Sequence, residues 1–393
     1  MSEAMDRGFS EAELRGRVRL AQARMALAGI DALLLTTEPE IRYFTGFLSD
    51  FWLSPTRPWY VVLPGSGEPV AIIPDIGKAA FACTWLSDVR TWPSPDPDAE
   101  GVPFVCDAIR EVVGEAGVIG IPMGQESHLR MPIEKFLWLR ETLSGFAFRD
   151  CTEIVKSLRM VKSGAEVAKI ESAARAAGAA FGALTRTTTE NDSERDLFRR
   201  FKIACLEAGA DDVPYLVGGT GTGGYDDIIS PPSGHRLRRG EVLLLDVGAR
   251  FDGYFCDFDR NFSVGPPSRE VADAYTRLRE AVEAGFVAAR PGATARDVFL
   301  AIHTAIDRGG GSPLPTGRYG HGLGMQLTEW PSLSATDATM LEDGMVLTLE
   351  PCLSLAPGRY LVHEEIILVS ETRNRYLTKP APDDIPEIRL VRN

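Results

Sequence analysis

The amino-acid sequence predicts an α+β protein in which a smaller α/β domain precedes a larger domain built around an antiparallel sheet. The chain has 393 residues, enough for two domains at roughly 150 residues each. Its first part alternates helix and strand patterns, whereas helices and hairpin-linked strands are segregated after about residue 160. We therefore predict one domain over residues 1–155 and a second over residues 156–393.

The first domain begins with an amphipathic helix and continues with short apolar strands. The helix is expected at residues 11–29, where apolar side chains recur at helical spacing. Apolar runs at residues 31–35, 59–63 and 69–73 lie between turns that contain glycine or proline, which is typical of buried strands. Alternating helices and strands of this kind predict an α/β domain.

The second domain begins with a helix whose start is marked by a capping box. Ser163-Gly-Ala-Glu166 places a hydroxyl and a carboxylate three residues apart, and an alanine-rich helix follows to about residue 187. Hairpin-linked strands after these helices favour a largely antiparallel sheet. Further helices are predicted at 193–208, 268–289 and 295–308, the last ended by Gly309, Gly310 and Gly311. Strands are predicted at 241–249, 254–264, 345–350 and 360–369.

The composition argues against several classes of protein. The formal net charge is −13, and the sequence lacks the clustered Lys and Arg that neutralise phosphates, so we exclude nucleic acid as the main partner. Apolar stretches are shorter than the roughly 18 residues of a membrane helix, and the charged N-terminus has no secretory apolar region. These short apolar stretches predict no membrane partner. Six scattered cysteines without CxxC pairs are typical of reduced thiols, which predicts a cytoplasmic protein.

Acidic side chains first gather in a predicted hairpin. Asp252-Gly253 is a strong turn signal between two apolar strands. A turn centred there places Asp246 opposite Asp259 and diagonal to Asp257, whereas a turn one residue earlier places Asp246 directly opposite Asp257. Either register brings carboxylates close enough to share a metal ion. Asp246 follows three leucines and is expected to be buried, where an unpaired carboxylate is costly.

Downstream motifs add one imidazole and further acids. His321 lies in Gly320-His-Gly-Leu-Gly324, which we expect to form a glycine-rich turn. Glu350 ends an apolar strand before a proline, and Glu364 and Glu365 interrupt another. Each motif alone is more often structural, but acids inside three apolar strands predict bound Mn, Co, Fe or Zn. Two such ions about 3.5–4 Å apart would generate a bridging hydroxide and polarise a carbonyl.

The order and spacing of these motifs resemble the creatinase, prolidase and methionine aminopeptidase family, whose catalytic domain has the pita-bread fold. Ile41-Arg-Tyr-Phe-Thr-Gly46 resembles part of the N-terminal domain of prolidase, aminopeptidase P and creatinase. The resemblance implies a cofactor of two divalent metal ions, with manganese first and cobalt, zinc or iron as alternatives. It also implies hydrolysis of an amide, commonly an Xaa-Pro bond, in a short peptide or another small molecule. The family resemblance further implies a homodimer.

Mapped onto the family pattern, these motifs form one ligand set. The pattern selects Asp257 over Asp259 and Glu364 over Glu365, and it implies that the selected pair bridges the two ions. Glu350 and His321 are implied as catalytic residues, with Glu350 as the proton shuttle for the attacking water. The implied metal ligands are Asp246, Asp257, His321, Glu350 and Glu364.

Three positions depart from the peptidase pattern. Ile229 and Thr328 stand where prolidases and aminopeptidase P carry histidines, and Val362 stands where they carry an arginine. Such histidines position the substrate and stabilise the developing oxyanion, so their replacement leaves peptidase chemistry open. The side chains that we consider as substitutes or substrate contacts are Thr328, His363, Tyr319, Arg260, Trp52, His235 and Tyr225.

The sequence is therefore compatible with three functions. The first and favoured one is an Xaa-Pro dipeptidase or aminopeptidase P-like metallohydrolase. The second is a relative that cleaves a small zwitterionic, creatine- or osmolyte-like compound, and an aromatic cage of Trp52, Trp59 and Trp330 around a cation is a hypothesis of this kind. The third is a non-catalytic binding module on the same fold, which the retained buried acids disfavour.

Overall fold

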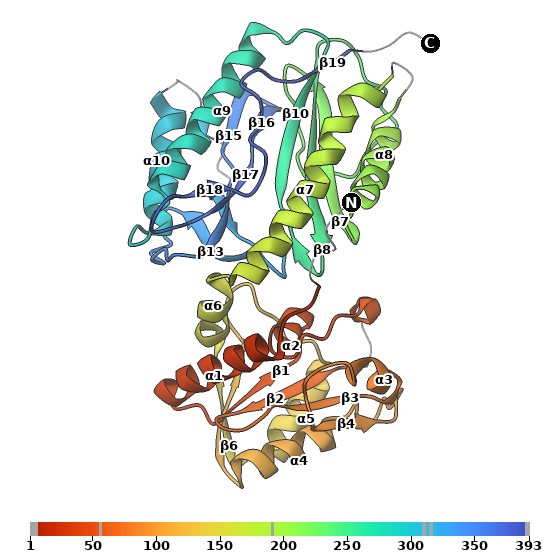
Figure 1. Ribbon diagram of the computed structural model, residues 1–393, viewed down its shortest axis with the longest axis vertical. Helices are drawn as coiled ribbons and strands as arrows, with labels where there is room; N and C mark the ends of the chain where they lie inside the picture. Colours follow the sequence, from red (N-terminus) through yellow and green to blue (C-terminus); the bar gives the residue numbers. More distant parts are fainter. Residues whose placement is uncertain (1–6, 55–56, 190–191, 309–311, 314–316, 390–393) are drawn as a thin grey trace. The chain divides into compact units, whose positions relative to one another are not determined.

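The computed structural model separates into two compact units, Met1–Arg159 and Met160–Asn393. Helix α6 (Thr152–Met160) runs through the boundary that the sequence predicted after residue 155. The division between the two units lies between Arg159 and Met160, the last residue of this helix, and the domain bounds 1–155 and 156–393 stay a prediction. The structure describes residues 7–54, 57–189, 192–308, 312–313 and 317–389 (Figure 1).

The N-terminal unit contains a mixed sheet. Its strands are β1 (Ala32–Leu35), β2 (Tyr60–Pro64), β3 (Val70–Pro74), β4 (Val89–Trp92), β5 (Gly117–Ile121) and β6 (Phe146–Asp150). They follow the order β4-β3-β2-β1-β5-β6, in which β1 pairs antiparallel with β2 and parallel with β5. Every residue of β1, β2 and β3 is buried, as expected for strands covered on both faces.

Helices complete this unit. Those beside α6 are α1 (Glu11–Ala28), α2 (Glu38–Thr45), α3 (Lys78–Phe81), α4 (Val102–Val113) and α5 (Ile133–Thr142). Helix α1 begins after Ser10, whose hydroxyl accepts a hydrogen bond from Glu13 N at 3.2 Å, and it ends at Gly29 with a left-handed φ of 64°. Helix α4 packs against β1, β2 and β3. The predicted α/β class of the N-terminal domain is confirmed.

The C-terminal unit is built on two larger sheets and a smaller one. One larger sheet combines β7 (Asp212–Thr222), β8 (Glu241–Phe251), β9 (Tyr254–Phe255), β10 (Phe258–Val264) and β19 (Glu387–Ile388). The other combines β12 (Arg318–Gly322), β13 (Glu329–Ser334), β14 (Val346–Leu349), β17 (Glu365–Leu368) and β18 (Arg375–Tyr376). The smaller sheet combines β11 (Ser312–Pro313), β15 (Cys352–Ala356) and β16 (Arg359–Val362).

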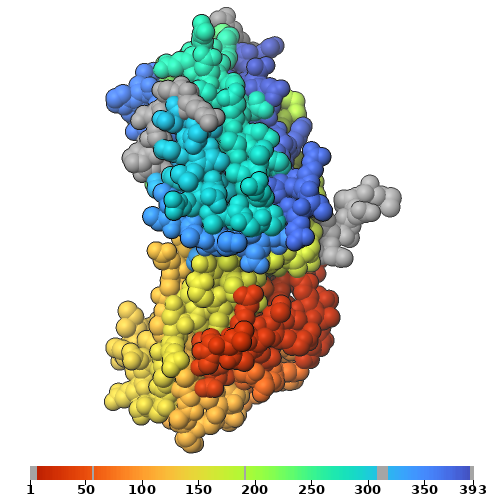
Figure 2. All heavy atoms as spheres, turned by 90° about the vertical axis from the view of Figure 1, so that its left-hand side faces the viewer, coloured from red at the N-terminus to blue at the C-terminus, as the bar shows by residue number. Residues whose placement is uncertain are grey.

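Among the described residues of this unit, strands pair antiparallel except β10 with β19, which confirms the predicted character of the sheet. Helices α7 (Gly164–Thr187) and α8 (Glu194–Glu207) pack against β8 and β7. Helices α9 (Arg269–Ala288) and α10 (Ala295–Arg308) pack against strands of the other sheets and cover one face of this unit, as Figure 2 shows in turquoise and cyan. Sheets enclosed by helices in this way form the predicted pita-bread fold.

Local capping explains where the helices begin. Ser163 Oγ accepts a hydrogen bond from Glu166 N at 3.2 Å, and Glu166 Oε2 accepts one from Ser163 N at 2.9 Å, so the predicted capping box starts α7. Helix α10 ends at Arg308, and the predicted stop at 309–311 lies outside the described residues. Within the described ranges, no helix is both long and apolar enough to cross a membrane.

Candidate metal centre

The hairpin of β8 and β10 carries the first acidic side chains. Asp252 and Gly253 both have positive φ angles, 44° and 67°, and form its turn. The register pairs Asp246 with Asp259, so the first of the two predicted registers is the observed one. Asp257 lies in a break between β9 and β10 that divides the strand predicted at 254–264. Asp257 is buried, whereas Asp246 is partly buried as a residue although its Oδ1 atom is buried, so its predicted burial holds for that carboxylate oxygen.

His321 lies on strand β12, so the predicted glycine-rich turn is wrong. A Cβ atom at Gly320 would lie 2.1 Å from Thr348 O, and one at Gly322 would lie 1.9 Å from Trp330 O. The two glycines therefore allow neighbouring strands to approach the backbone closely on either side of the histidine, rather than reversing the chain. This approach fixes His321 in the middle of a sheet.

Glu350 and Glu364 lie at matching interruptions of two neighbouring strands. The pairs Leu349–Glu365 and Cys352–Val362 belong to one register, which places Glu350 opposite Glu364. His363 N donates a hydrogen bond to Pro351 O at 3.1 Å across this interruption. The strand predicted at 360–369 is consequently divided into β16 and β17. Residues opposite each other in an antiparallel pair share a face, so the two carboxylates are neighbours.

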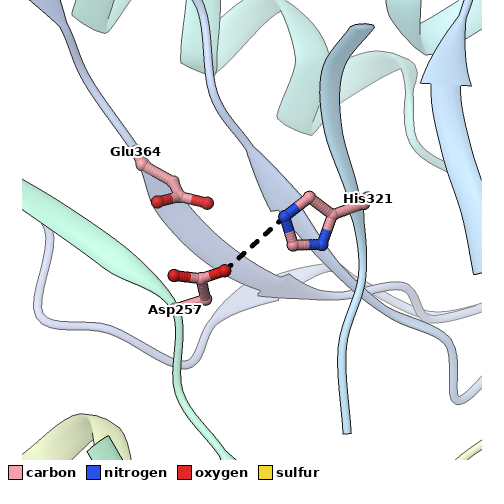
Figure 3. A group of neighbouring side chains, drawn as sticks. All are labelled: Asp257, His321 and Glu364. Atoms are coloured by element: carbon pink, nitrogen blue, oxygen red, sulfur yellow. Dashed lines mark ion pairs between the residues drawn. The ribbon is translucent and has the colours of Figure 1, made fainter. Parts of the chain in front are cut away.

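Three of these side chains converge from different elements. Asp257, His321 and Glu364 offer ligand atoms that all lie within 4.8 Å of one another, and Figure 3 shows them facing a common point. His321 Nε2 lies 3.5 Å from Asp257 Oδ2. His321 Nδ1 lies 2.8 Å from Gly322 O, and a proton donated there leaves the Nε2 lone pair facing the carboxylates. Burial and Arg318 lower the pKa of His321 to about 4, so the ring is neutral at neutral pH.

The carboxylates of the centre repel one another. Burial, followed by the charges of neighbouring acids, raises the pKa of Asp246, Asp257 and Glu364 well above the ordinary range. Burial and the charge of Asp259 raise the pKa of Glu350 to about 7. Among the described residues, Asp246 Oδ1 and Glu364 Oε1 are buried without a hydrogen-bond partner. An oxygen-rich group with one neutral imidazole and unsatisfied negative charge fits divalent cations.

Two neighbours of the centre were not predicted from the sequence. Tyr215 on β7 donates a hydrogen bond to Asp246 Oδ2 at 3.0 Å. Arg318 on β12 partly offsets the burial and like charges that raise the pKa of Asp257. Tyr215 was missed because β7 itself was not predicted. Its place opposite Gly248 on β8 follows from the register.

Arg260 and His363 lie behind Glu364. Arg260 donates hydrogen bonds to Glu364 O at 3.0 Å and to Glu365 Oε2 at 2.9 Å. His363 places Nδ1 3.5 Å from Asp259 Oδ1 and Nε2 3.5 Å from Glu365 Oε1. Both side chains are buried. They support the backbone and outer acids of the centre, and their role as substrate contacts stays a prediction.

The other substrate candidates occupy different surroundings. The hydroxyl of Tyr319 lies 3.2 Å from His303 Nδ1, in the helix-packed core. Thr328 is partly buried in the segment before β13. Trp52 belongs to the N-terminal unit, where its ring lies 5.5 Å from that of Trp59. The aromatic cage stays a hypothesis.

Hydroxyl and imidazole groups considered as substitutes for the missing histidines are engaged in structural contacts. His235 Nε2 lies 2.9 Å from Glu241 Oε1. Tyr225 donates a hydrogen bond to Asn261 Oδ1 at 3.0 Å and accepts one from Val362 N at 2.6 Å. Ile229 is 72% exposed on the loop after β7. None of these contacts restores an imidazole to the positions of Ile229 or Thr328.

Comparison with known proteins agrees with this geometry. A model of the creatinase/prolidase N-terminal domain matches residues 17–161. The model of metallopeptidase family M24 matches residues 168–371, the span that carries every predicted ligand. The chain belongs to metallopeptidase family M24. The resemblance inferred from the motifs and the prediction of a metallohydrolase are thereby confirmed.

Relatives of this M24 protein include named dipeptidases. The probable dipeptidase PepE of Mycobacterium tuberculosis is 28% identical over 364 residues, which cover 90% of this chain and 92% of that protein. The Xaa-Pro dipeptidase of Pyrococcus furiosus is 27% identical over 362 residues, which cover 89% and 94%. The crystal structure of dipeptidase PepE from Mycobacterium ulcerans has a TM-score of 0.84 at 27% identity and covers 98% of this chain and 100% of that one.

Removing metal from this M24 protein is expected to reverse the pH dependence of its stability. Burial and like charges raise the pKa values of Asp246, Asp257 and Glu364, and Glu350 titrates at about 7 instead of 4.5. Between the unfolded and folded pKa values the folded metal-free chain binds more protons, so its free energy of unfolding falls as pH rises. Thermal unfolding in chelator should therefore occur at a lower temperature near about pH 7.5 than near about pH 5.5.

Added Mn²⁺ should reverse this trend, because the ions bind the deprotonated carboxylates. The lowered pKa of His321 makes the free energy of unfolding rise with pH between about pH 4 and pH 6.5. This single group opposes the four acids of the centre, so the downward trend is expected to dominate. Groups outside the centre titrate in the same way with chelator and with Mn²⁺. The difference between the two sets of melting curves therefore reports the acids of the centre. Parallel pH dependences under the two conditions would contradict the assignment of these acids to a metal centre.

Proposed function

We propose that this protein hydrolyses the amide bond of short peptides, with Xaa-Pro dipeptides as the first candidates, at a centre of two divalent cations. The observation that carries the proposal is the convergence of Asp257, His321 and Glu364 within 4.8 Å. Asp246 and Glu350 act electrostatically on the same group. Relatives named dipeptidase and Xaa-Pro dipeptidase, aligned over most of both chains, support the substrate class.

The side chains divide the work between holding ions and moving protons. When bound, the two ions supply a water that is deprotonated near neutral pH and a Lewis acid that polarises the substrate carbonyl. Asp257 and Glu364 would hold the ions through their carboxylate oxygens, and His321 would offer its Nε2 lone pair to the same centre. The carboxylate of Glu350, which lies opposite Glu364 in the strand register, is the proposed group that accepts and returns the proton of the attacking water.

Oxygen donors dominate this ligand set, which supports manganese as the resident ion. Hard cations favour carboxylate oxygen, whereas sulfur-rich sites select zinc or iron–sulfur clusters. Tyr215 holds Asp246 Oδ2 and Gly322 O orients the ring of His321, so outer partners restrict both side chains. Cobalt, zinc and iron remain the alternatives for the ion-content measurement. The homodimer that the family resemblance implies and the cytoplasmic location predicted from the cysteines complete the proposal, and light scattering tests the dimer.

A second candidate is cleavage of a small zwitterionic, non-peptide compound. It is favoured by Ile229 and Thr328, which lack the proton-donating rings expected of a peptidase, and by the structural contacts of His235 and Tyr319. A buried donor that is lost from an oxyanion site typically costs about 10²–10³ in rate. A non-peptide substrate that develops less charge on oxygen would not need these donors.

A substrate panel distinguishes these functions. Purified protein is assayed with Xaa-Pro dipeptides, dipeptides without proline, creatine and zwitterionic osmolytes, each with Mn²⁺ and with chelator. We expect metal-dependent hydrolysis of dipeptides that returns when Mn²⁺ is restored. Turnover of only the non-peptide compounds would replace the first proposal with the second. Bound metal without turnover of any compound would favour the binding-module alternative.

A further inference from the structure

Asp259 is a buried acid beside the predicted ligand set that the family pattern does not select. It lies on β10 directly opposite Asp246 on β8. Side chains at opposite positions of an antiparallel pair share a face, with Cβ atoms about 4.5–5.5 Å apart. Asp259 is 1% exposed, so water does not screen its charge. It is therefore an inner neighbour of the centre and not a surface acid.

The two oxygens of Asp259 have different surroundings. Oδ1 accepts a hydrogen bond from Glu364 N at 3.1 Å and lies 3.5 Å from His363 Nδ1. Oδ2 is buried and has no hydrogen-bond partner within the described part of the chain. A buried carboxylate oxygen without a donor carries a large desolvation penalty. The unsatisfied oxygen lies on the residue that faces Asp246, and a cation is the partner that would satisfy it.

Glu365 provides the contrast within the same cluster. It is also buried and also not selected by the family pattern, but each of its oxygens has partners. Oε1 accepts a hydrogen bond from Ala381 N at 2.8 Å, and Oε2 accepts hydrogen bonds from Arg260 at 2.9 Å and from Thr378. Glu365 thus forms an ordinary buried ion pair with the guanidinium of Arg260. Asp259 has no such cation within hydrogen-bond distance of Oδ2 in the described residues.

We propose that Asp259 is an additional carboxylate ligand of the metal centre, binding a divalent cation through Oδ2 while Oδ1 fixes the backbone of Glu364. This inference rests on the metal centre of the proposed function. Four carboxylates balance the charge of two divalent ions, and Asp259 adds a fifth. The added oxygen donor favours a hard ion such as Mn²⁺ over softer competitors, and it strengthens binding on the side of Asp246.

The test measures metal binding in an Asp259→Asn variant of the full chain. Asparagine keeps an oxygen that accepts the hydrogen bond from Glu364 N, but it removes the charge. Titration calorimetry and equilibrium dialysis with Mn²⁺ should show that one ion binds about 10–100-fold more weakly, the range typical of lost metal-site partners. In chelator the variant should melt no lower than the natural chain, because one repelling acid has been removed.

Glu241→Gln is the matched control. Glu241 is also a buried acid on β8, but its partner is His235 at 2.9 Å, so its Mn²⁺ affinity should be unchanged. If Asp259→Asn does not fold, Asp259→Ser keeps a hydroxyl oxygen for Glu364 N and allows the same measurement.

The possible results separate this inference from the proposed function. Unchanged Mn²⁺ affinity and stoichiometry in Asp259→Asn would overturn the inference while leaving dipeptidase activity intact as a proposal. Weakened Mn²⁺ binding in a protein that cleaves no dipeptide would support the inference and reject the proposed substrate. A natural chain that binds no divalent ion would overturn both.

Discussion

An Asp257→Asn variant is expected to lose a bound ion and more than about 100-fold of its activity, since outer partners of metal ligands alone are typically worth 10–100-fold. Asp257 is buried, and its Oδ2 lies 3.5 Å from His321 Nε2. Bulk water therefore cannot take the place of its carboxylate as a metal ligand. The amide keeps the size of the side chain but removes the charge that balances a cation. Metal content after dialysis against Mn²⁺, and kcat/KM on a substrate from the panel, measure the two losses.

The control for this variant is Asp273→Asn on α9. The side chain of Asp273 is 67% exposed and pairs loosely with Arg269 at 3.6 Å, so neither metal content nor activity should change. In chelator, the Asp257→Asn protein should have a melting temperature equal to or above that of the metal-free natural chain, because repulsion among the acids is reduced. Full metal content in Asp257→Asn would show that this carboxylate is not a ligand.

An Arg260→Met variant is expected to lose about 3–5 kcal/mol of unfolding free energy, the typical effect of removing one partner of a buried ion pair. Burial alone would raise the pKa of Glu365, but Arg260 and His363 lower it to about 2. Without the guanidinium, the buried Glu365 carboxylate loses its arginine partner, and Glu364 O loses its hydrogen bond. Thermal unfolding should shift downward by roughly 6–20 °C for a unit of this size.

Arg279→Met supplies the comparison for this loss. Arg279 pairs with Asp383 at 2.7 Å, but the side chain of Asp383 is 94% exposed. Exposed pairs typically contribute about 0–1 kcal/mol, so this variant should unfold almost as the natural chain does. A double variant, Arg260→Met with Glu365→Leu, should recover part of the lost stability. Equal effects of Arg260→Met and Arg279→Met would show that the buried pair is not a major support of the fold.

The sequence predicted the elements whose ends carry local signals. Helix α7 begins at the capping box of Ser163 and Glu166, and the turn of the β8–β10 hairpin is set by Asp252-Gly253. Strand β7 was missed because its glycines, including Gly218 and Gly221, lower the apparent strand propensity. Cβ atoms at these two positions would lie about 2 Å from backbone oxygens of neighbouring segments, so the glycines serve close packing that only the tertiary structure reveals.

The chemistry of the site was predicted only as far as residue types and strand period allow. The period of a strand left Asp257 and Asp259 equivalent, and only the family resemblance separated them. His321 lies on a strand because β12 pairs with β13, where His321 is opposite Ser332, and with β14, but its flanking glycines look like a turn in the sequence. The roles of Tyr215 toward Asp246 and of Arg318 toward Asp257 likewise depend on segments that are distant in the sequence.

The interruptions that divide β9 from β10 and β16 from β17 give the proposed ions a mechanical role. Asp257 lies directly before β10 of one large sheet, whereas His321 lies on β12 of the other, 64 residues further along the chain, and Glu364 lies directly before β17, 107 residues further along. Ions held by all three join the sheets as a reversible cross-link. Each tenfold change in free ion then shifts folding stability by about 1.4 kcal/mol per site once binding is saturated. The metal supply around the protein would thereby help to set the folding stability of the C-terminal unit.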